Sequence, residues 1–129
     1  MIFYHASKHA YDFPDYNKLT KNRENHLNGN LGLWVASKND WISGFGNIIY
    51  EVEIDDKDVS IILVDHLFSW EKENDMSEDY YINLRIKLLE KYKSVAFIEN
   101  SGSVGMGIIL DFSVIKSFKP VVPTKKLKV

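Results

Sequence analysis

Residues 47–54 read NIIYEVEI, and from Ile49 onward the segment alternates with a period of two. Successive side chains of a β-strand point to opposite faces of a sheet. The two faces are Ile49, Glu51 and Glu53 on one side, and Tyr50, Val52 and Ile54 on the other. The pattern predicts a strand that places one face on a core and the other toward water.

Further strands and one long helix are predicted around this segment. Apolar stretches bounded by turn-forming residues lie at residues 2–6, 31–37, 59–65, 94–99, 107–112 and 114–118. Residues 77–92 are predicted to be a helix, because apolar side chains recur there at helical spacing, namely Tyr81, Ile82, Leu84, Ile86, Leu88, Leu89 and Tyr92. A short helix is expected at residues 37–42, where Ser37 and Asp40 resemble a capping box. An acidic, water-facing connection is expected at residues 70–79.

Composition limits the classes of protein. The chain has 129 residues, of which 45% are hydrophobic and 26% charged, and its formal net charge is −2. This predicts one domain over residues 1–129 and excludes intrinsic disorder. The small net charge argues against a protein that coats duplex nucleic acid electrostatically. The chain has no cysteine, which excludes disulfides, thiolate zinc sites and cysteine nucleophiles.

No membrane-spanning segment is predicted. The longest apolar runs, around residues 60–64 and 104–110, are far shorter than the roughly 20 residues that a spanning helix needs. The amino-terminal residues enter a predicted strand directly and do not form a signal peptide. We therefore expect a cytoplasmic protein with no membrane partner.

No metal site or phosphate loop is predicted. The four histidines, His5, His9, His26 and His66, have none of the spacings of common metal motifs. Residues 102–107 are rich in glycine but lack the lysine and the following helix of a phosphate loop, so we expect a hairpin there.

Residues 7–30 are predicted to be a long, locally basic loop. Its cationic residues are Lys8, Lys18, Lys21 and Arg23. Two interpretations stay open, either a solvated loop face or contacts with a diphosphate or nucleic acid at the mouth of a pocket.

The order of four segments resembles a known family. Residues 4–7 (YHAS), 31–37 (LGLWVAS), 49–54 (IYEVEI) and 108–117 (IILDFSVIKS) are similar to successive motifs of the ADP-ribosyltransferases. The similarity is to the histidine–tyrosine–glutamate branch, which includes the poly-ADP-ribose polymerase and diphtheria-toxin types. It implies an α+β fold in which two small antiparallel β-sheets form a split sandwich with flanking helices. NAD, the substrate of these enzymes, would bind in the cleft between the sheets.

The resemblance implies NAD-binding roles for three residues of the first motif. His5 would hydrogen-bond the ribose in the adenosine half of NAD. The backbone of Ala6, which replaces the family's glycine, would hold the nicotinamide carboxamide. Ser7 would bond the nicotinamide ribose or the carboxamide. Without the resemblance, His5 in an apolar strand is interpreted as a hydrogen-bonded core histidine.

The second motif implies a wall for the nicotinamide pocket. Trp34 replaces the family's tyrosine and would stack on the nicotinamide ring, and Ala36 and Ser37 would line the same pocket. The residue-based interpretation of Trp34 is core packing, because large aromatic side chains bury the most apolar area.

The third motif departs from the family. Met106 occupies the position of the catalytic glutamate, and a thioether cannot stabilise the positive charge that develops on the ribose. Glu99 is the nearest acid and would substitute across the hairpin if the strand register differs. The loss of the glutamate argues against poly-ADP-ribose elongation.

The expected function is therefore an NAD-binding mono-ADP-ribosyltransferase, a toxin or phage effector that releases nicotinamide and transfers ADP-ribose to a protein or nucleic acid. One alternative is an inactive protein of the same fold that acts as a nucleotide-binding or protein-binding inhibitor or interaction module. A small interaction protein with an accidental likeness and an NAD glycohydrolase are the others.

Overall fold

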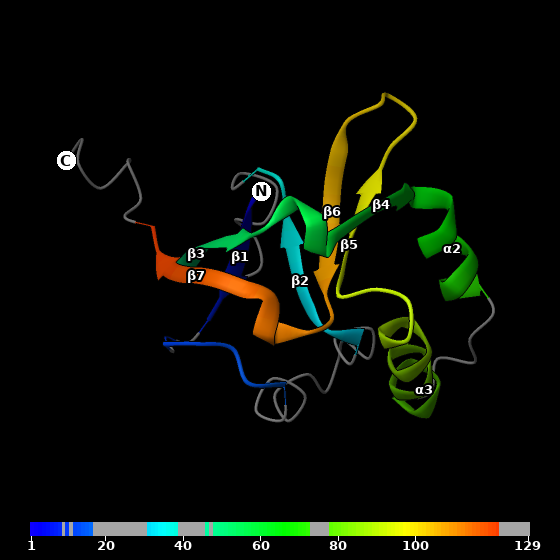
Figure 1. Ribbon diagram of the computed structural model, residues 1–129, viewed down its shortest axis with the longest axis horizontal. Coiled ribbons are helices and arrows are strands. Elements are labelled where there is room, and N and C mark those ends of the chain that lie inside the picture. Colours follow the sequence, from blue (N-terminus) through cyan, green and yellow to red (C-terminus); the bar gives the residue numbers. More distant parts are fainter. Residues whose placement is uncertain are drawn as a thin grey trace.

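The computed structural model describes residues 1–8, 10, 12–16, 31–38, 46, 48–72 and 78–121. Its strands form one sheet in the order β4-β5-β6-β2-β1-β3-β7 (Figure 1). They are β1 (Ile2–Ser7), β2 (Leu33–Ala36), β3 (Ile48–Ile54), β4 (Val59–Leu63), β5 (Ser94–Ile98), β6 (Val104–Ile109) and β7 (Ile115–Pro120). Neighbouring strands are antiparallel except β4 and β5, which are parallel.

Two α-helices lie beside the β4–β5 end of the sheet, as Figure 1 shows. Helix α2 (Val64–Lys72) follows β4 directly, and α3 (Glu78–Leu89) precedes β5. The one-turn helices η3 (Asp56–Asp58) and η4 (Phe112–Val114) precede β4 and β7. Within the described part of the chain, no helix is long and apolar enough to cross a membrane.

The predicted split sandwich of two antiparallel sheets with flanking helices is wrong. The described residues are mostly β rather than α+β. Their strands form one curled, mixed sheet, a half-barrel accompanied in the described part of the chain by the helices α2 and α3. Strand β2 pairs with β1 through Tyr4 and Ala36 and with β6 through Ala36 and Met106, so the hydrogen-bonded ladder is continuous. Alternation predicts which residues form strands but not which strands pair, because pairing depends on residues far apart in the chain.

Each face of the sheet has its own core. The inner cluster, on the concave face, comprises Phe3, Leu33, Val35, Tyr50, Val52, Ile54, Ala96, Ile109 and Ile115. The helix-side cluster comprises Leu31, Leu67, Tyr81, Leu88, Val95, Phe97, Ile108 and Leu110. The inner cluster joins residues of β5 and β7, which are far apart in the strand order, so the sheet has to curl to bring them into contact.

The alternating segment forms the predicted strand. In β3, Tyr50, Val52 and Ile54 are buried, whereas Glu51 and Glu53 are half-buried on the other face. The remaining predicted strands also form, with shifted ends; the one expected at 107–112 is β6, which begins at Val104. Alternation in residues 49–54 and apolar stretches elsewhere therefore identified the strands.

Two helical expectations need correction. Residues 64–72 form α2, where the end of a strand and an acidic connection were predicted. Leu67 is buried in the helix-side cluster, and such tertiary packing stabilises a short helix that local propensity does not specify. In α3, Tyr81 and Leu88 are buried but Ile86 is 57% exposed, so the apolar face is narrower than predicted. The short helix predicted at 37–42 falls outside the described residues beyond position 38.

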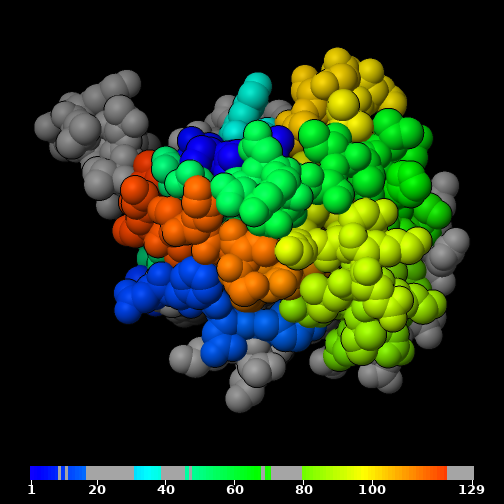
Figure 2. Space-filling model, viewed as in Figure 1, coloured from blue at the N-terminus to red at the C-terminus, as the bar shows by residue number. Residues whose placement is uncertain are grey.

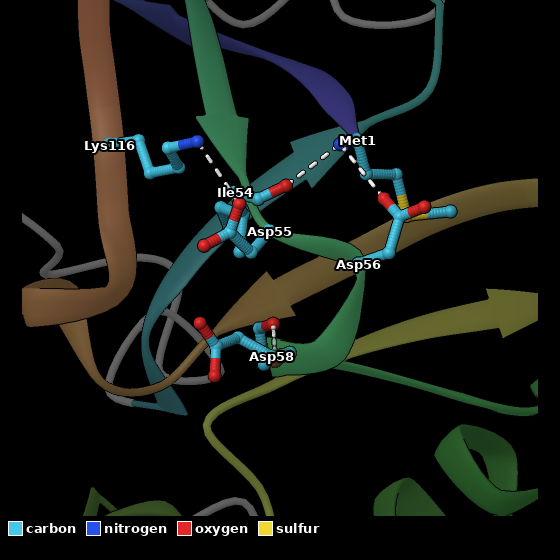
Figure 3. Close-up of polar contacts among 7 residues, drawn as sticks. Met1, Ile54, Asp55, Asp56, Asp58 and Lys116 are labelled. Atoms are coloured by element: carbon cyan, nitrogen blue, oxygen red, sulfur yellow. Dashed lines mark hydrogen bonds and ion pairs between the residues drawn. The ribbon is translucent and has the colours of Figure 1, made fainter.

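Charged contacts fix the turn between β3 and β4 (Figure 3). The Met1 amino group donates a hydrogen bond to the Ile54 carbonyl oxygen at 2.7 Å and lies 3.0 Å from the Asp56 carboxylate. Lys116 Nζ lies 3.1 Å from Asp55 Oδ1 and connects β7 to the same turn. At this turn the chain leaves β3, next to the β7 edge, and crosses to β4 at the opposite edge.

Gly32 allows β2 and β6 to approach closely. A Cβ atom at Gly32 would lie 2.3 Å from the Ile109 carbonyl oxygen, which belongs to rigid backbone. We expect Gly32→Ala to lower the free energy of unfolding by about 3 kcal/mol, measured by urea unfolding. Gly102→Ala is the comparison, because Gly102 has a φ of 85° and open space around it. That variant loses only about 1 kcal/mol from left-handed strain, and an equal loss in both variants would contradict the close approach.

Candidate functional site

The strand registers place the predicted site residues on two faces of the sheet. Directly paired residues of antiparallel strands point to the same face, and the next residue along each strand points to the other. The pairs Tyr4–Ala36, Trp34–Ile108 and Ala36–Met106 set these faces. Ala6, Trp34, Ala36 and Met106 therefore share the helix-side face, whereas His5 and Ser7 share the inner face with Tyr50 and Ile48.

His5 is a buried, hydrogen-bonded residue of the inner face. Its side chain is 5% exposed, and its Nδ1 lies 2.8 Å from the carbonyl oxygen of Trp34. A carbonyl oxygen only accepts, so Nδ1 donates this bond. The ring centroid lies 6.5 Å from that of Phe118. This arrangement agrees with the core histidine that the residue-based interpretation predicted, and the role of His5 toward NAD stays a prediction.

Trp34 faces away from His5. It packs against the helix-side cluster, which agrees with the residue-based interpretation of core packing. The two side chains that the resemblance assigned to NAD are therefore not brought together on one face of the sheet. The His5 ring donates a hydrogen bond to the Trp34 backbone, which joins the two residues across the strand pair.

Ser37 and Ala36 support the pairing of β2 with β6. The Ser37 hydroxyl donates to the Val104 carbonyl oxygen at 2.7 Å, and the Ser37 N–H donates to the Gly105 carbonyl oxygen at 2.9 Å. Ala36 is completely buried. Both residues therefore contribute to the pairing of β2 with β6. Their position in the wall of a nicotinamide pocket stays a prediction.

Glu99 and Met106 lie on the β5–β6 hairpin. Glu99 follows β5 in the exposed turn, where its N–H donates to the Ser103 carbonyl oxygen at 2.9 Å. Met106 is 43% exposed and is paired with Ala36. Strands β2 and β1 separate this hairpin from β3 and β7 in the sheet.

An aromatic cavity lies on the inner face at the β3–β7 edge. It has a volume of about 420 Å³ and is lined by Ala10, Asp12, Ile48, Tyr50, Phe118 and Pro120. The Tyr50 and Phe118 rings stack with centroids 4.4 Å apart and an interplanar angle of 17°. Phe13, which is 49% exposed, makes an edge contact with Phe118 at 6.1 Å. We refer to this site as the aromatic cavity.

The chemistry of the aromatic cavity favours a flat ring that is neutral or positively charged. Aromatic faces carry negative quadrupole potential, which attracts cations and the edges of other rings. Asp12 adds an exposed carboxylate to the lining. Sequence reasoning did not single out Asp12, Tyr50 or Phe118 as site residues. The sequence contained only part of the necessary information. Alternation in residues 49–54 placed Tyr50 on the same face as Val52 and Ile54, but it could not predict that β3 pairs with β7.

Arg85 forms a second cluster, on the helix side. Its guanidinium carbon lies 3.9 Å from the centre of the Tyr16 ring, and its Nη1 donates to the Leu31 carbonyl oxygen at 2.8 Å. Burial lowers the pKa of the Arg85 guanidinium, opposed by the nearby Tyr16 and Asp111. The cluster connects α3 to Tyr16 and Leu31, the two described residues on either side of positions 17–30. Of the four cationic residues of the predicted basic loop, Lys8 is the one that the structure describes, and it is exposed.

Asp111 begins η4 and gives a pH-dependent contribution to stability. Its Oδ1 accepts hydrogen bonds from the Ser113 hydroxyl at 2.6 Å and the Ser113 N–H at 3.0 Å, which hold the pKa of Asp111 below its ordinary value of 3.8. A carboxyl group whose pKa is lower in the folded state than in the unfolded state stabilises the protein at pH values above its unfolded-state pKa. This contribution is lost as the pH falls through the folded-state pKa. We expect Asp111→Asn to flatten the loss of stability between about pH 5 and pH 2, measured by thermal unfolding. An unchanged acid profile would contradict this role.

No group of three or more histidine, aspartate or glutamate side chains is placed to hold a metal ion among the residues that the structure describes.

Comparison with known proteins assigns no family. No protein-family model and no curated protein matches the sequence. Among solved structures, the crystal structure of an anti-CRISPR protein aligns with 94% of this chain and 95% of its own, at 13% sequence identity and a TM-score of 0.49. A likeness of this degree carries no functional argument.

Proposed function

We propose that this protein binds the nicotinamide end of NAD in the aromatic cavity and acts as a mono-ADP-ribosyltransferase. The reaction releases nicotinamide and transfers ADP-ribose to a protein or nucleic-acid acceptor. The observation that carries the proposal is the position of His5. This residue, which the family resemblance singled out, contacts the same Phe118 ring that forms the wall of the cavity.

The size and lining of the cavity support a nicotinamide ribose. A volume of about 420 Å³ lies within the range of small-molecule sites, and it suits one ring with its ribose rather than the whole dinucleotide. The oxidised nicotinamide ring is flat and positively charged. It can pack against the aromatic wall that the stacked Tyr50 and Phe118 rings form together, with the Asp12 carboxylate supplying the opposite charge.

Asp12 is the acid that the geometry favours for the chemical step. When the bond between ribose and nicotinamide breaks, its electron pair leaves with nicotinamide and positive charge develops on the ribose. A carboxylate at the cavity stabilises that charge, and the acceptor then attacks the ribose carbon and loses a proton. Glu99, on the far side of β6, β2 and β1, is less well placed for this role.

The proposed activity requires a compartment that supplies NAD, which is the cytoplasm expected from the sequence. The same activity suits a toxin or phage effector that modifies a host macromolecule.

A second candidate is a non-catalytic module that binds NAD or a related nucleotide, or a protein partner. Two observations favour it. Met106 stands where the family has its glutamate, and Trp34 lies on the opposite face from His5. If the ligand of the module is NAD, both candidates bind NAD, but only the enzyme releases nicotinamide. Nicotinamide release therefore distinguishes them.

Asp12→Asn tests the binding site. We expect NAD to stabilise the wild type by about 2.7 kcal/mol at a hundredfold excess over its dissociation constant, measured by thermal shift. The variant should bind at least about tenfold more weakly, because it loses the charge that faces the cationic ring. Glu51→Gln is the matched control, since Glu51 neighbours Tyr50 on β3 but points to the other face.

Trp34→Leu decides which face of the sheet binds NAD. The variant keeps an apolar side chain in the helix-side cluster but removes the aromatic ring. With NAD in the aromatic cavity, the dissociation constant should stay within about twofold of the wild-type value, because the ring is not part of the site. Loss of NAD affinity at unchanged melting temperature would move the site to the helix-side face and contradict the proposed cavity.

Nicotinamide release tests the enzyme activity. We expect the wild type to release nicotinamide from NAD in the presence of a cell extract as a source of acceptor. The rate should fall at least about tenfold in Asp12→Asn. NAD binding without nicotinamide release would favour the non-catalytic module and contradict the enzyme. If the protein does not bind NAD, both the enzyme and an NAD-binding module are overturned.

A further inference from the structure

One wall of the aromatic cavity comes from a segment outside the sheet. Strands β3 and β7 supply four of the lining residues, and Ala10 and Asp12 come from the residues that follow β1. In Figure 2, the blue atoms directly below the orange atoms of η4 and β7 include residues 12–16. We refer to residues 12–16 as the strap.

Side-chain contacts hold the strap against the sheet. Its first four residues belong to no helix or strand, so a ladder of backbone hydrogen bonds does not fix their position. Phe13 makes an edge contact with Phe118 of β7, and Tyr16 makes one with Phe112 of η4, with ring centroids 6.4 Å apart. Pro14, between the two aromatic residues, is buried. The strap is therefore docked near both of its ends.

Arg85 of α3 holds the strap at Tyr16. Its guanidinium carbon lies 3.9 Å from the centre of the Tyr16 ring and 5.8 Å from that of Phe112. A guanidinium is attracted to the negative face of an aromatic ring, more strongly where water is excluded, and Arg85 is half-buried. The hydrogen bond from its Nη1 to the Leu31 carbonyl oxygen, at 2.8 Å, fixes the guanidinium over the ring.

We propose that Arg85 is a positioning residue of the aromatic cavity. By holding Tyr16, it keeps the strap docked and so places the Asp12 carboxylate at the ligand. The effect on the ligand rests on the proposed binding of NAD, whereas the docking of the strap does not. Arg85 acts from α3 through Tyr16, so its loss removes none of the side chains that line the cavity.

The strap is short and stiff enough to transmit the position of Tyr16 to Asp12. Only Phe13, Pro14 and Asp15 separate the two residues. The ring of Pro14 fixes its own φ and restricts the backbone of the residue before it. A strap released at Tyr16 depends on Phe13, whose side chain is 49% exposed, so we expect it to open more often.

A buried thiol tests the docking without any ligand. The chain has no native cysteine, so Pro14→Cys introduces a single thiol at a buried position of the strap. A thiol reagent should react with it slowly, because labelling requires local opening. Adding Arg85→Met or Tyr16→Leu should raise the labelling rate at least about tenfold, since either change removes the contact between guanidinium and ring.

Lys87→Met is the matched control for Arg85→Met. It removes an exposed cation of the same helix and should leave the labelling rate unchanged. The proposal is overturned by an unchanged rate in Arg85→Met, or by a Pro14→Cys thiol that reacts as fast in the folded protein as in the unfolded chain.

Tyr16→Phe tests whether Arg85 holds the face of the ring. The variant keeps an aromatic face under the guanidinium, so its labelling rate should stay within about twofold of the Pro14→Cys background. A rate as high as that of Tyr16→Leu would contradict the contact between guanidinium and ring.

A double-variant cycle with Asp12 separates positioning from general stability. Arg85→Met alone should weaken NAD binding about tenfold, and Asp12→Asn should then weaken it less than about threefold further, because the carboxylate no longer faces the ligand. A merely destabilised protein would show the full effect of Asp12→Asn in both backgrounds, and that outcome would overturn the positioning role. Isothermal titration calorimetry gives the affinities, at a temperature at which thermal melts show every variant to be folded.

The two measurements also separate this inference from the proposed function. If the wild type does not bind NAD, the proposed function fails, and thiol labelling still decides whether Arg85 holds the strap. If NAD binds but labelling does not respond to Arg85→Met, the proposed function stands and Arg85 has no positioning role.

Discussion

The pairing of β2 with two neighbours is the interaction on which the rest of the structure depends. β2 has four residues, yet it pairs with β1 on one side and with β6 on the other. Without it, β1, β3 and β7 would form one sheet and β4, β5 and β6 another. Gly32 permits the junction, because the backbone of β6 lies too close there for any side chain. The inner cluster then forms from residues of both halves.

A continuous ladder also decides where chemistry can take place. Because consecutive residues of a strand face opposite ways, the ladder directs His5 to the inner face and Trp34 to the helix side. The centre of the sheet is occupied by the two cores, so an open site can form only toward its edges. The aromatic cavity lies at the β3–β7 edge, where Tyr50 and Phe118 extend the inner face beyond the closed core. His5 connects the core to this cavity through its contact with Phe118.

The two ends of the sheet therefore differ in character. The β7 end carries lysines, a proline and an aromatic cavity, which suit a small ligand and discourage strand pairing. The β4 end has no charged residue, proline or glycine, and it exposes the Ile61 and Leu63 side chains. The turn between β3 and β4 connects these ends and is held by Met1 and Lys116.

The sequence by itself determined the strands and the long helix, because apolar patterning and helical spacing are local properties of the chain. It also predicted that Tyr50 faces inward and that cysteine chemistry is absent. Only the tertiary structure decided that the strands form one sheet, that residues 64–72 are helical, and that His5 and Trp34 point apart. The aromatic cavity was likewise hidden, since Asp12, Tyr50 and Phe118 lie on three separate segments. These features depend on contacts between residues distant in the chain, and the pattern of one segment contains no information about its partner.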